Sequence, residues 1–107
     1  MPKRLRVSGK DLQRTVIDYA HSKHWHCVHN PAVETKQGWR TALAADAKGF
    51  VDILCFRDRT VAVEIKGDGD TLKPEQEQWG WWLQTAGVEY YVIRPADWPD
   101  VVREIFD

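Results

Sequence analysis

Hydrophobic positions along the chain fall into blocks whose spacing predicts seven elements of secondary structure. Apolar residues recur at helical intervals near the N-terminus and predict a helix over residues 12–24. Short apolar runs rich in β-branched and aromatic residues predict four strands, over residues 25–29, 50–56, 61–66 and 89–93. Two more helices are expected over residues 71–87 and 97–106, each with a proline near its first turn. The order α-β-β-β-α-β-α predicts one α/β domain over residues 1–107, a sandwich with a mixed central sheet flanked by helices.

Residues 31–48 interrupt this pattern with a long polar connection. Within it, the stretch TALAADA at residues 41–47 is compatible with one helical turn. A connection of this length inside a small domain indicates either a functional loop or disorder.

Three charged residues stand inside the two central apolar strands. Asp52 lies within the run VDIL, and Glu64 and Lys66 flank Ile65 at the end of the next run. Because side chains alternate between the two faces of a strand, Glu64 and Lys66 share one face. Antiparallel pairing of the two strands would bring Asp52 beside Glu64, with Lys66 just beyond.

The two carboxylates of Asp52 and Glu64 would repel each other and lose hydration in an apolar sheet. A divalent cation removes both costs, and Mg²⁺ needs only one or two carboxylates because it keeps several waters. The backbone carbonyl of Ile65 is a candidate for a further ligand. Lys66 would then orient or activate a water, or stabilise charge that builds on phosphorus. The alternative is a structural ion pair between the acids and Lys66 at a sheet edge.

The helix after these strands places a polar amide on its apolar face. Gln76 precedes Trp79 and Leu83 at helical spacing, and Trp79 and Trp82 are predicted to lie in the core. Trp81 points the other way, towards a dimer interface, stacked bases or the C-terminal segment. The amide indicates a hydrogen-bonding role near the strand ends, whereas a solvated glutamine at a frayed helix start is the alternative.

A longer motif joins these features over about residues 47–95, in the stretch KGFVDIL…VAVEIKGDGDTLKPEQEQWGWWLQTAGVEYYVIR. A glycine precedes the first acid, a hydrophobic strand leads into E-x-K, and a polar loop leads into L-K-P-E-Q. An aromatic helix ending in A-G then leads into a strand that ends in arginine. Together, these motifs resemble the VRR-NUC domain of the PD-(D/E)XK nuclease superfamily. The resemblance implies a restriction-endonuclease-like sandwich and a metal-dependent deoxyribonuclease that hydrolyses phosphodiester bonds.

The resemblance also implies roles for individual residues. Asp52 and Glu64 match the metal-binding acids of the family, and Lys66 matches its catalytic lysine. Gln76 matches the glutamine of the following helix, with the expected task of positioning Lys66 or a phosphate oxygen. The family further implies Mg²⁺ or Mn²⁺ as cofactor, duplex or branched DNA as substrate, and pairing as a homodimer.

The chain departs from the family pattern in two places. Val51 stands before the first acid, where the family often has proline. The first helix offers Asp11 and Gln13 as possible contributors where the family often has glutamate. If Asp11 does not reach the metal, we expect weak or Mn²⁺-dependent activity.

Charge and composition narrow the functional class only slightly. The 107 residues are 43% hydrophobic and 29% charged, which is typical of a globular domain. A net charge of −1 does not by itself indicate a nucleic-acid-binding protein. Basic residues that cluster locally are candidate contacts to the DNA backbone: Arg4, Arg6, Lys36, Arg40 and Lys48. The alternative is that they are ordinary solvated surface charges. A DNA-binding module that keeps the nuclease fold without cutting is the rival function.

Location and cysteine content give two further expectations. No apolar run is long enough to span a membrane and no signal-peptide core follows the basic N-terminus, so we expect a cytoplasmic protein. The family resemblance suggests a bacterial or phage-encoded one.

Cys27 and Cys55 are too few for a disulfide framework and are expected to be reduced thiols in strands. The histidines around Cys27 are poorly spaced for zinc.

Overall fold

A computed structural model describes residues 7–29, 32–35, 38–41 and 45–107, with only the backbone described over 32–35 and 38–41. The elements are, in chain order, α1 (Gly9–Ser22), β1 (His26–His29), β2 (Ala32–Thr35), β3 (Gly38–Thr41), β4 (Ile53–Phe56), β5 (Thr60–Ile65), α2 (Pro74–Thr85), β6 (Glu89–Ile93), the 3₁₀ helix η1 (Pro95–Asp97) and α3 (Asp100–Phe106). The predicted α/β class is confirmed, and the predicted helices and strands recur with boundaries shifted by a few residues. The last predicted helix is divided into η1 and α3.

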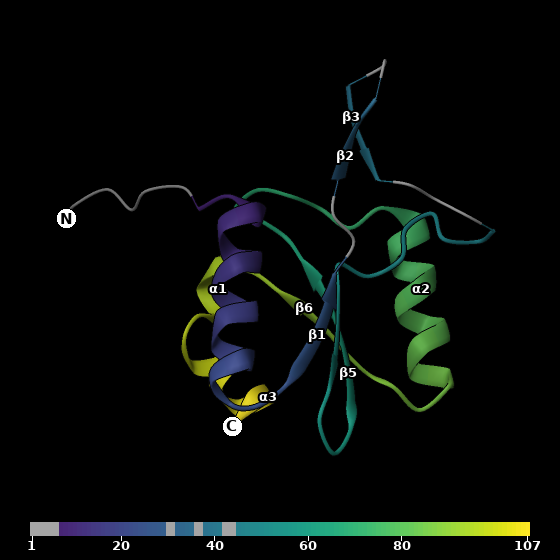
Figure 1. The fold of residues 1–107 in the computed structure, drawn as a ribbon. Coiled ribbons are helices and arrows are strands. Elements are labelled where there is room, and N and C mark those ends of the chain that lie inside the picture. Colours follow the sequence, from purple (N-terminus) through teal and green to yellow (C-terminus); the bar gives the residue numbers. More distant parts are fainter. Residues whose placement is uncertain (1–6, 30–31, 36–37, 42–44) are drawn as a thin grey trace.

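The central sheet has four strands in the order β1-β4-β5-β6. β1 pairs antiparallel with β4, β4 pairs antiparallel with β5, and β5 runs parallel to β6. Because parallel neighbours require a crossover connection, α2 carries the chain from the end of β5 to the start of β6. Figure 1 shows α1 and α3 on one face of the sheet and α2 on the other, which makes three layers.

The main hydrophobic core lies between the sheet and the helices α1 and α3. Alternate strand residues point into this layer, and α1 contributes the apolar stripe that its sequence predicts. The buried residues of this cluster are Leu12, Val16, Ala20, Trp25, Ile53, Cys55, Val61, Val63, Ile65, Ile93, Val102, Ile105 and Phe106. Trp25 packs edge-on against Phe106 and donates its indole N–H to the Phe106 carbonyl at 2.9 Å. This face of the sheet is thus filled by apolar packing, and the polar strand residues are directed to the face of α2.

The long connection contains a two-stranded hairpin that the hydrophobic pattern does not predict. β2 and β3 pair antiparallel, with Thr35 opposite Gly38. Figure 1 shows this hairpin projecting beyond one end of the central sheet. Four-residue strands give too few alternations to be distinguished from a polar loop by sequence. Thr41 ends β3, so the helical turn suggested for residues 41–47 is not formed at its first residue, and residues 42–44 lie outside the described part.

Helix α2 lies on the opposite face and buries less than its sequence suggests. Its buried residue is Gly80, where a Cβ would come within 2.6 Å of the ring of Tyr90 on β6. Trp79 lies edge-on to Phe50 and to Trp82, and Trp82 is 43% exposed. The predicted core position is therefore wrong for Trp82, because the close approach of α2 to the sheet runs through its glycine rather than its tryptophans.

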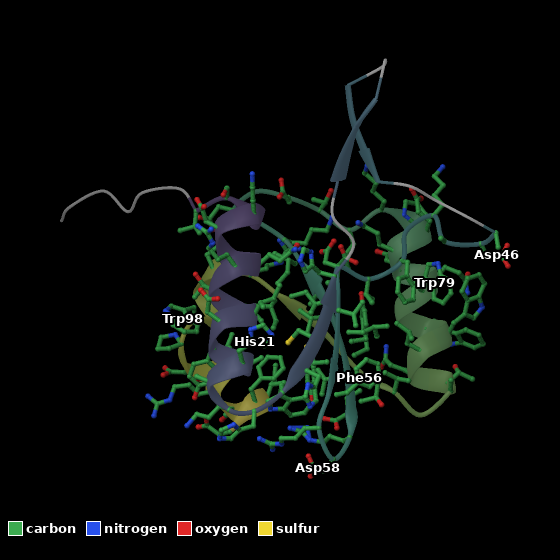
Figure 2. The ribbon with its side chains drawn as sticks, viewed as in Figure 1. His21, Asp46, Phe56, Asp58, Trp79 and Trp98 are labelled. Atoms are coloured by element: carbon green, nitrogen blue, oxygen red, sulfur yellow. The ribbon has the colours of Figure 1, made fainter. Side chains whose placement is uncertain are left out.

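The segment that leads into β4 packs against the first turn of α2. Trp79 Nε1 donates to the Asp46 carbonyl at 3.1 Å, and Figure 2 shows both residues on the side of α2 away from the sheet. Gly49 has φ +81°, and a Cβ there would lie 2.7 Å from the carbonyl carbon of Glu75. Because the backbone of α2 cannot give way to a side chain, this position requires glycine. The contact holds the start of α2 next to the segment that carries Asp52.

We expect Gly49→Ala to destabilise the protein more than Gly87→Ala. Both glycines have positive φ, but a Cβ at Gly87 would meet nothing within 4 Å. Gly87→Ala should lower the free energy of unfolding by about 1–2 kcal/mol through its backbone conformation. Gly49→Ala should lower it by roughly 1–3 kcal/mol more, through overlap with Glu75. Urea unfolding followed by tryptophan fluorescence measures both values, and equal losses would contradict the packing.

Candidate functional site

The pairing of β4 with β5 sets Asp52 opposite Glu64. Ile53 is the register partner of Val63, and the Asp52 N–H extends the ladder by donating to the Val63 carbonyl at 3.1 Å. One step further in this register, Asp52 faces Glu64 on the side of the sheet that α2 covers. Asp52 Oδ2 accepts the Ile65 N–H at 2.7 Å, which orients the carboxylate. The structure thus brings together the two acids that the strand alternation places on one face.

Glu64 is almost completely buried, with 1% of its surface exposed. Its Oε1 accepts a hydrogen bond from Gln76 Nε2 at 3.1 Å, whereas Oε2 has no donor within the described residues. Burial, followed by the negative charge of Asp52, raises the pKa of Glu64 to about 8, and the charge of Lys66 opposes this. The carboxyl group therefore retains a proton at neutral pH unless a cation stabilises its charged form.

Lys66 is the second buried charged residue of the site, with 8% of its surface exposed. Its backbone N–H donates to the Ile93 carbonyl at 3.0 Å, which joins the end of β5 to β6. Its side chain follows Glu64 on the same face of the sheet. In the part of the chain that the structure describes, no carboxylate lies within ion-pair distance of the Lys66 ammonium. The structural ion pair considered as an alternative is therefore not formed among these residues.

Gln76 connects the first turn of α2 to Glu64. Its Oε1 accepts the Lys73 N–H at 2.9 Å, which leaves its amide nitrogen to donate to Glu64. The two bonds fix the orientation of the amide, since the reverse orientation would set donor against donor and acceptor against acceptor. In the structure the amide nitrogen of Gln76 thus bonds Glu64, and positioning of Lys66 or a phosphate oxygen by Gln76 stays a prediction.

Tyr90 is a residue of this face that the sequence reasoning missed. It pairs with Ala62 in the parallel register of β6 with β5, so its ring lies on the same side as Glu64. Its hydroxyl is buried without a partner among the described residues. Burial, followed by the charges of Glu64, Asp52 and Glu77, raises the pKa of Tyr90. The parallel crossover through α2 is the signal that would have placed Tyr90 beside the acids.

The two candidates from the first helix have different surroundings. The Asp11 N–H donates to Ser8 Oγ at 3.1 Å and the Asp11 carboxylate accepts the Ser8 hydroxyl at 2.9 Å, so Ser8 caps α1 and its hydroxyl binds the Asp11 carboxylate. Gln13 Nε2 lies 3.4 Å from Nδ1 of His29, whose register partner is Ile53, the first residue of β4. Gln13 therefore lies beside the end of β1 that pairs with the start of β4, on the face of the sheet that α1 covers.

The loop after β5 ties this end of the sheet to its neighbours. Asp68 Oδ2 accepts the Val7 N–H at 3.2 Å, and Asp70 Oδ2 accepts the Gly67 N–H at 3.0 Å. Arg94, directly after β6, donates to the Asp70 carbonyl at 2.7 Å. The loop is thus bonded both to the residues before α1 and to the end of β6.

The predicted DNA-binding residues are described only in part. Arg4, Arg6 and Lys36 lie outside the described residues, and Arg40 belongs to β3, of which only the backbone is described. Lys48 is exposed in the turn that packs against the first turn of α2. Lys48 therefore stands near the helix end that carries Gln76.

Comparison of the chain with protein-family models, curated proteins and solved structures gave no match. Within the described ranges, no three His, Cys, Asp or Glu side chains gather in a group that could hold a metal ion. No helix there is both long and apolar enough to cross a membrane. The site among these residues is therefore a pair of facing carboxylates, a buried ammonium group and one oriented amide.

We expect the stability of the metal-free protein to fall as pH rises from about 4.5 to about 8 because of Glu64. In the folded protein Glu64 keeps its carboxyl proton up to about pH 8, whereas in the unfolded chain it releases the proton near pH 4.5. The contribution of Glu64 to the free energy of unfolding is therefore complete below about pH 4.5 and lost above about pH 8. Thermal unfolding in the presence of a chelator, measured as a function of pH, should show the decline. Glu64→Gln should remove it, while Glu77→Gln, at an exposed position on α2, should leave it; an unchanged slope in Glu64→Gln would contradict the assignment.

Proposed function

We propose that the chain is a divalent-metal-dependent DNA nuclease of the VRR-NUC type, with a restriction-endonuclease-like fold. The observation that carries this proposal is the buried pair Asp52 and Glu64, with Lys66 next on the same face of β5. A buried carboxyl oxygen without a donor lowers stability, and such groups gather at functional sites. The family resemblance over about residues 47–95 supports the same function independently of the geometry.

The oxygen donors suit Mg²⁺ or Mn²⁺. Glu64 Oε2 is a buried oxygen that lacks a partner among the described residues, and a hard divalent cation takes carboxylate oxygens. Asp52 and Glu64 would hold the ion, with the Ile65 carbonyl at the end of β5 as a third ligand. Two carboxylates are sufficient because Mg²⁺ retains several waters. When bound, the ion would supply Lewis-acid polarisation of a phosphate oxygen.

The residues of the chain would perform the remaining tasks of phosphodiester hydrolysis. In this reaction water adds to phosphorus and a deoxyribose oxygen leaves. The Lys66 ammonium, free of ion pairs among the described residues, would stabilise the negative charge that grows on the phosphate, or orient the water. Gln76 would hold Oε1 of Glu64, so that Oε2 remains directed at the cation.

DNA would lie across the end of the sheet at which the acids stand. Lys48 lies beside the start of α2, and the hairpin that includes Arg40 projects beyond this end in Figure 1. The proposed contacts to the DNA backbone also include Arg4, Arg6 and Lys36. Branched DNA as the preferred substrate, a homodimer and a cytoplasmic location belong to the same proposal. Trp81 of α2, 61% exposed, is available for contact with a second copy.

A DNA-binding module that retains the fold without cutting is the second candidate. The observation that favours it is the small number of acids, because within the described residues Asp52 and Glu64 have no third acidic ligand beside them. Asp11, the expected supplement, accepts the hydroxyl of the helix-capping residue Ser8 instead. This candidate predicts binding without turnover.

We expect the protein to cleave labelled duplex, flap or four-way-junction DNA with Mg²⁺ or Mn²⁺. Glu64→Gln and Lys66→Met should each lower the cleavage rate at least about 100-fold, since each removes a group that acts on the reacting phosphate. Glu77→Gln and Lys23→Met change exposed residues of the same types and should cleave at the wild-type rate. Binding of these DNAs by wild type with no cleavage in either metal would favour the module without nuclease activity.

We expect Mg²⁺ and Mn²⁺ to raise the melting temperature of the wild-type protein, even without DNA. A ligand that binds only the folded state at about 100 times its Kd adds roughly 2.7 kcal/mol of stability. Glu64→Gln should lose this increase and Glu77→Gln should retain it. Thermal unfolding monitored by circular dichroism provides the measurement. The same increase in all three proteins would place the ion elsewhere.

A further inference from the structure

Cys27 and Cys55 are direct partners across two neighbouring strands. The antiparallel register of β1 with β4 pairs them, and their sulfur atoms are hydrogen-bonded at 3.8 Å. Opposite residues of antiparallel strands have Cα atoms about 4.5–5.5 Å apart, within the range of about 4.4–6.8 Å found for disulfides. Rotation of the side chains within the existing register would therefore bring the sulfurs to a bonding distance of about 2 Å.

The two thiols differ in their access to solvent. β1 is an edge strand of the central sheet, and Cys27 is half-buried there between exposed His26 and Val28. Cys55 is fully buried in the main core. A small oxidant arriving from solvent therefore meets Cys27 first, and Cys55 lies directly behind it.

The electrostatics of the pair favour the same order of reaction. The contact between the two sulfurs lowers the pKa of the Cys27 thiol, against the opposing effect of burial. The same interaction and then burial raise the pKa of Cys55. Because the thiolate is the reactive form, Cys27 is the attacking group and Cys55 the resolving group.

We propose that Cys27 and Cys55 are a peroxide-sensitive dithiol that converts reversibly into a disulfide between β1 and β4. The Cys27 thiolate attacks one oxygen of hydrogen peroxide, the O–O bond breaks, and hydroxide leaves as Cys27 becomes a sulfenic acid. The Cys55 sulfur then attacks that of Cys27, the S–O bond breaks, and the Cys55 proton leaves with the oxygen as water. The two thiols lose two electrons and the peroxide is reduced to water.

The bond would fix the edge strand to its neighbour and close a loop around the β2–β3 hairpin. Such a crosslink stabilises chiefly by restricting the unfolded chain. β1 leads into the hairpin, and β4 begins directly after Asp52. The disulfide would therefore hold the base of the hairpin and Asp52 at the same end of the sheet. The proposal does not depend on the nuclease activity.

The experiment treats the reduced full-length protein with hydrogen peroxide and counts free thiols after denaturation. We expect wild type to lose both thiols and remain a single chain, with a linked pair of Cys27 and Cys55 peptides after digestion without reductant. Dithiothreitol should restore both thiols. The oxidised form should melt at a higher temperature than the reduced form, and far-UV circular dichroism should show that it remains folded.

Two variants assign the roles within the pair. Cys27→Ser, at a half-buried position, should keep the thiol of Cys55 unreacted under the same treatment. Cys55→Ala should leave Cys27 without a resolving partner, so that it proceeds to the sulfinic acid or links two chains. Three results with wild type would each overturn the proposal. These are an over-oxidised Cys27 beside an intact Cys55 thiol, disulfides formed only between chains, and no reaction with peroxide.

Discussion

The register of β4 against β5 is the constraint on which the site depends. Side chains alternate across a strand, so a slip of one residue would turn Glu64 into the apolar layer with α1 and α3. Ile53 and Val63, both fully buried in that layer, prevent this slip because they could not be exposed without losing their packing. The burial of one set of positions thus forces the intervening set, which includes Asp52 and Glu64, onto the face under α2. Stability of the core and assembly of the acids are consequences of the same alternation.

Much of the fold follows from the hydrophobic pattern alone. The strand Glu89–Ile93 and the glycine after α2 occur where the pattern predicts them, because each combines an apolar period with a clear stop signal. The hairpin β2–β3 does not follow from the pattern, since strands this short offer too few alternating positions. The exposure of Trp82 was also not predictable, because helical periodicity identifies an apolar face but not which part of it reaches the sheet. That was decided by Gly80, whose lack of a side chain admits the ring of Tyr90.

The candidate site, like the fold, could be predicted from the sequence only in part. The juxtaposition of Asp52 and Glu64 could be predicted from two strands and a tight turn, which are local in sequence. The hydrogen bond from Gln76 and the buried hydroxyl of Tyr90 depend on how α2 and β6 pack onto β5, which is set by distant contacts. Asp11 was a reasonable candidate on residue type, but the serine three positions earlier binds its carboxylate. This local hydrogen bond depends on the geometry of the helix start, which composition alone does not show.

The amide of Gln76 has a consequence for the behaviour of α2 as a whole. One face of this group accepts the Lys73 N–H and completes the helix start, while the other donates to Glu64. A displacement of the glutamate carboxyl group would therefore strain the first turn of the helix, and fraying of that turn would release the glutamate. The first turn of α2 and the carboxyl group of Glu64 are thus joined through a single side chain. Lys48, in the turn seated on that same stretch of helix, would shift with it.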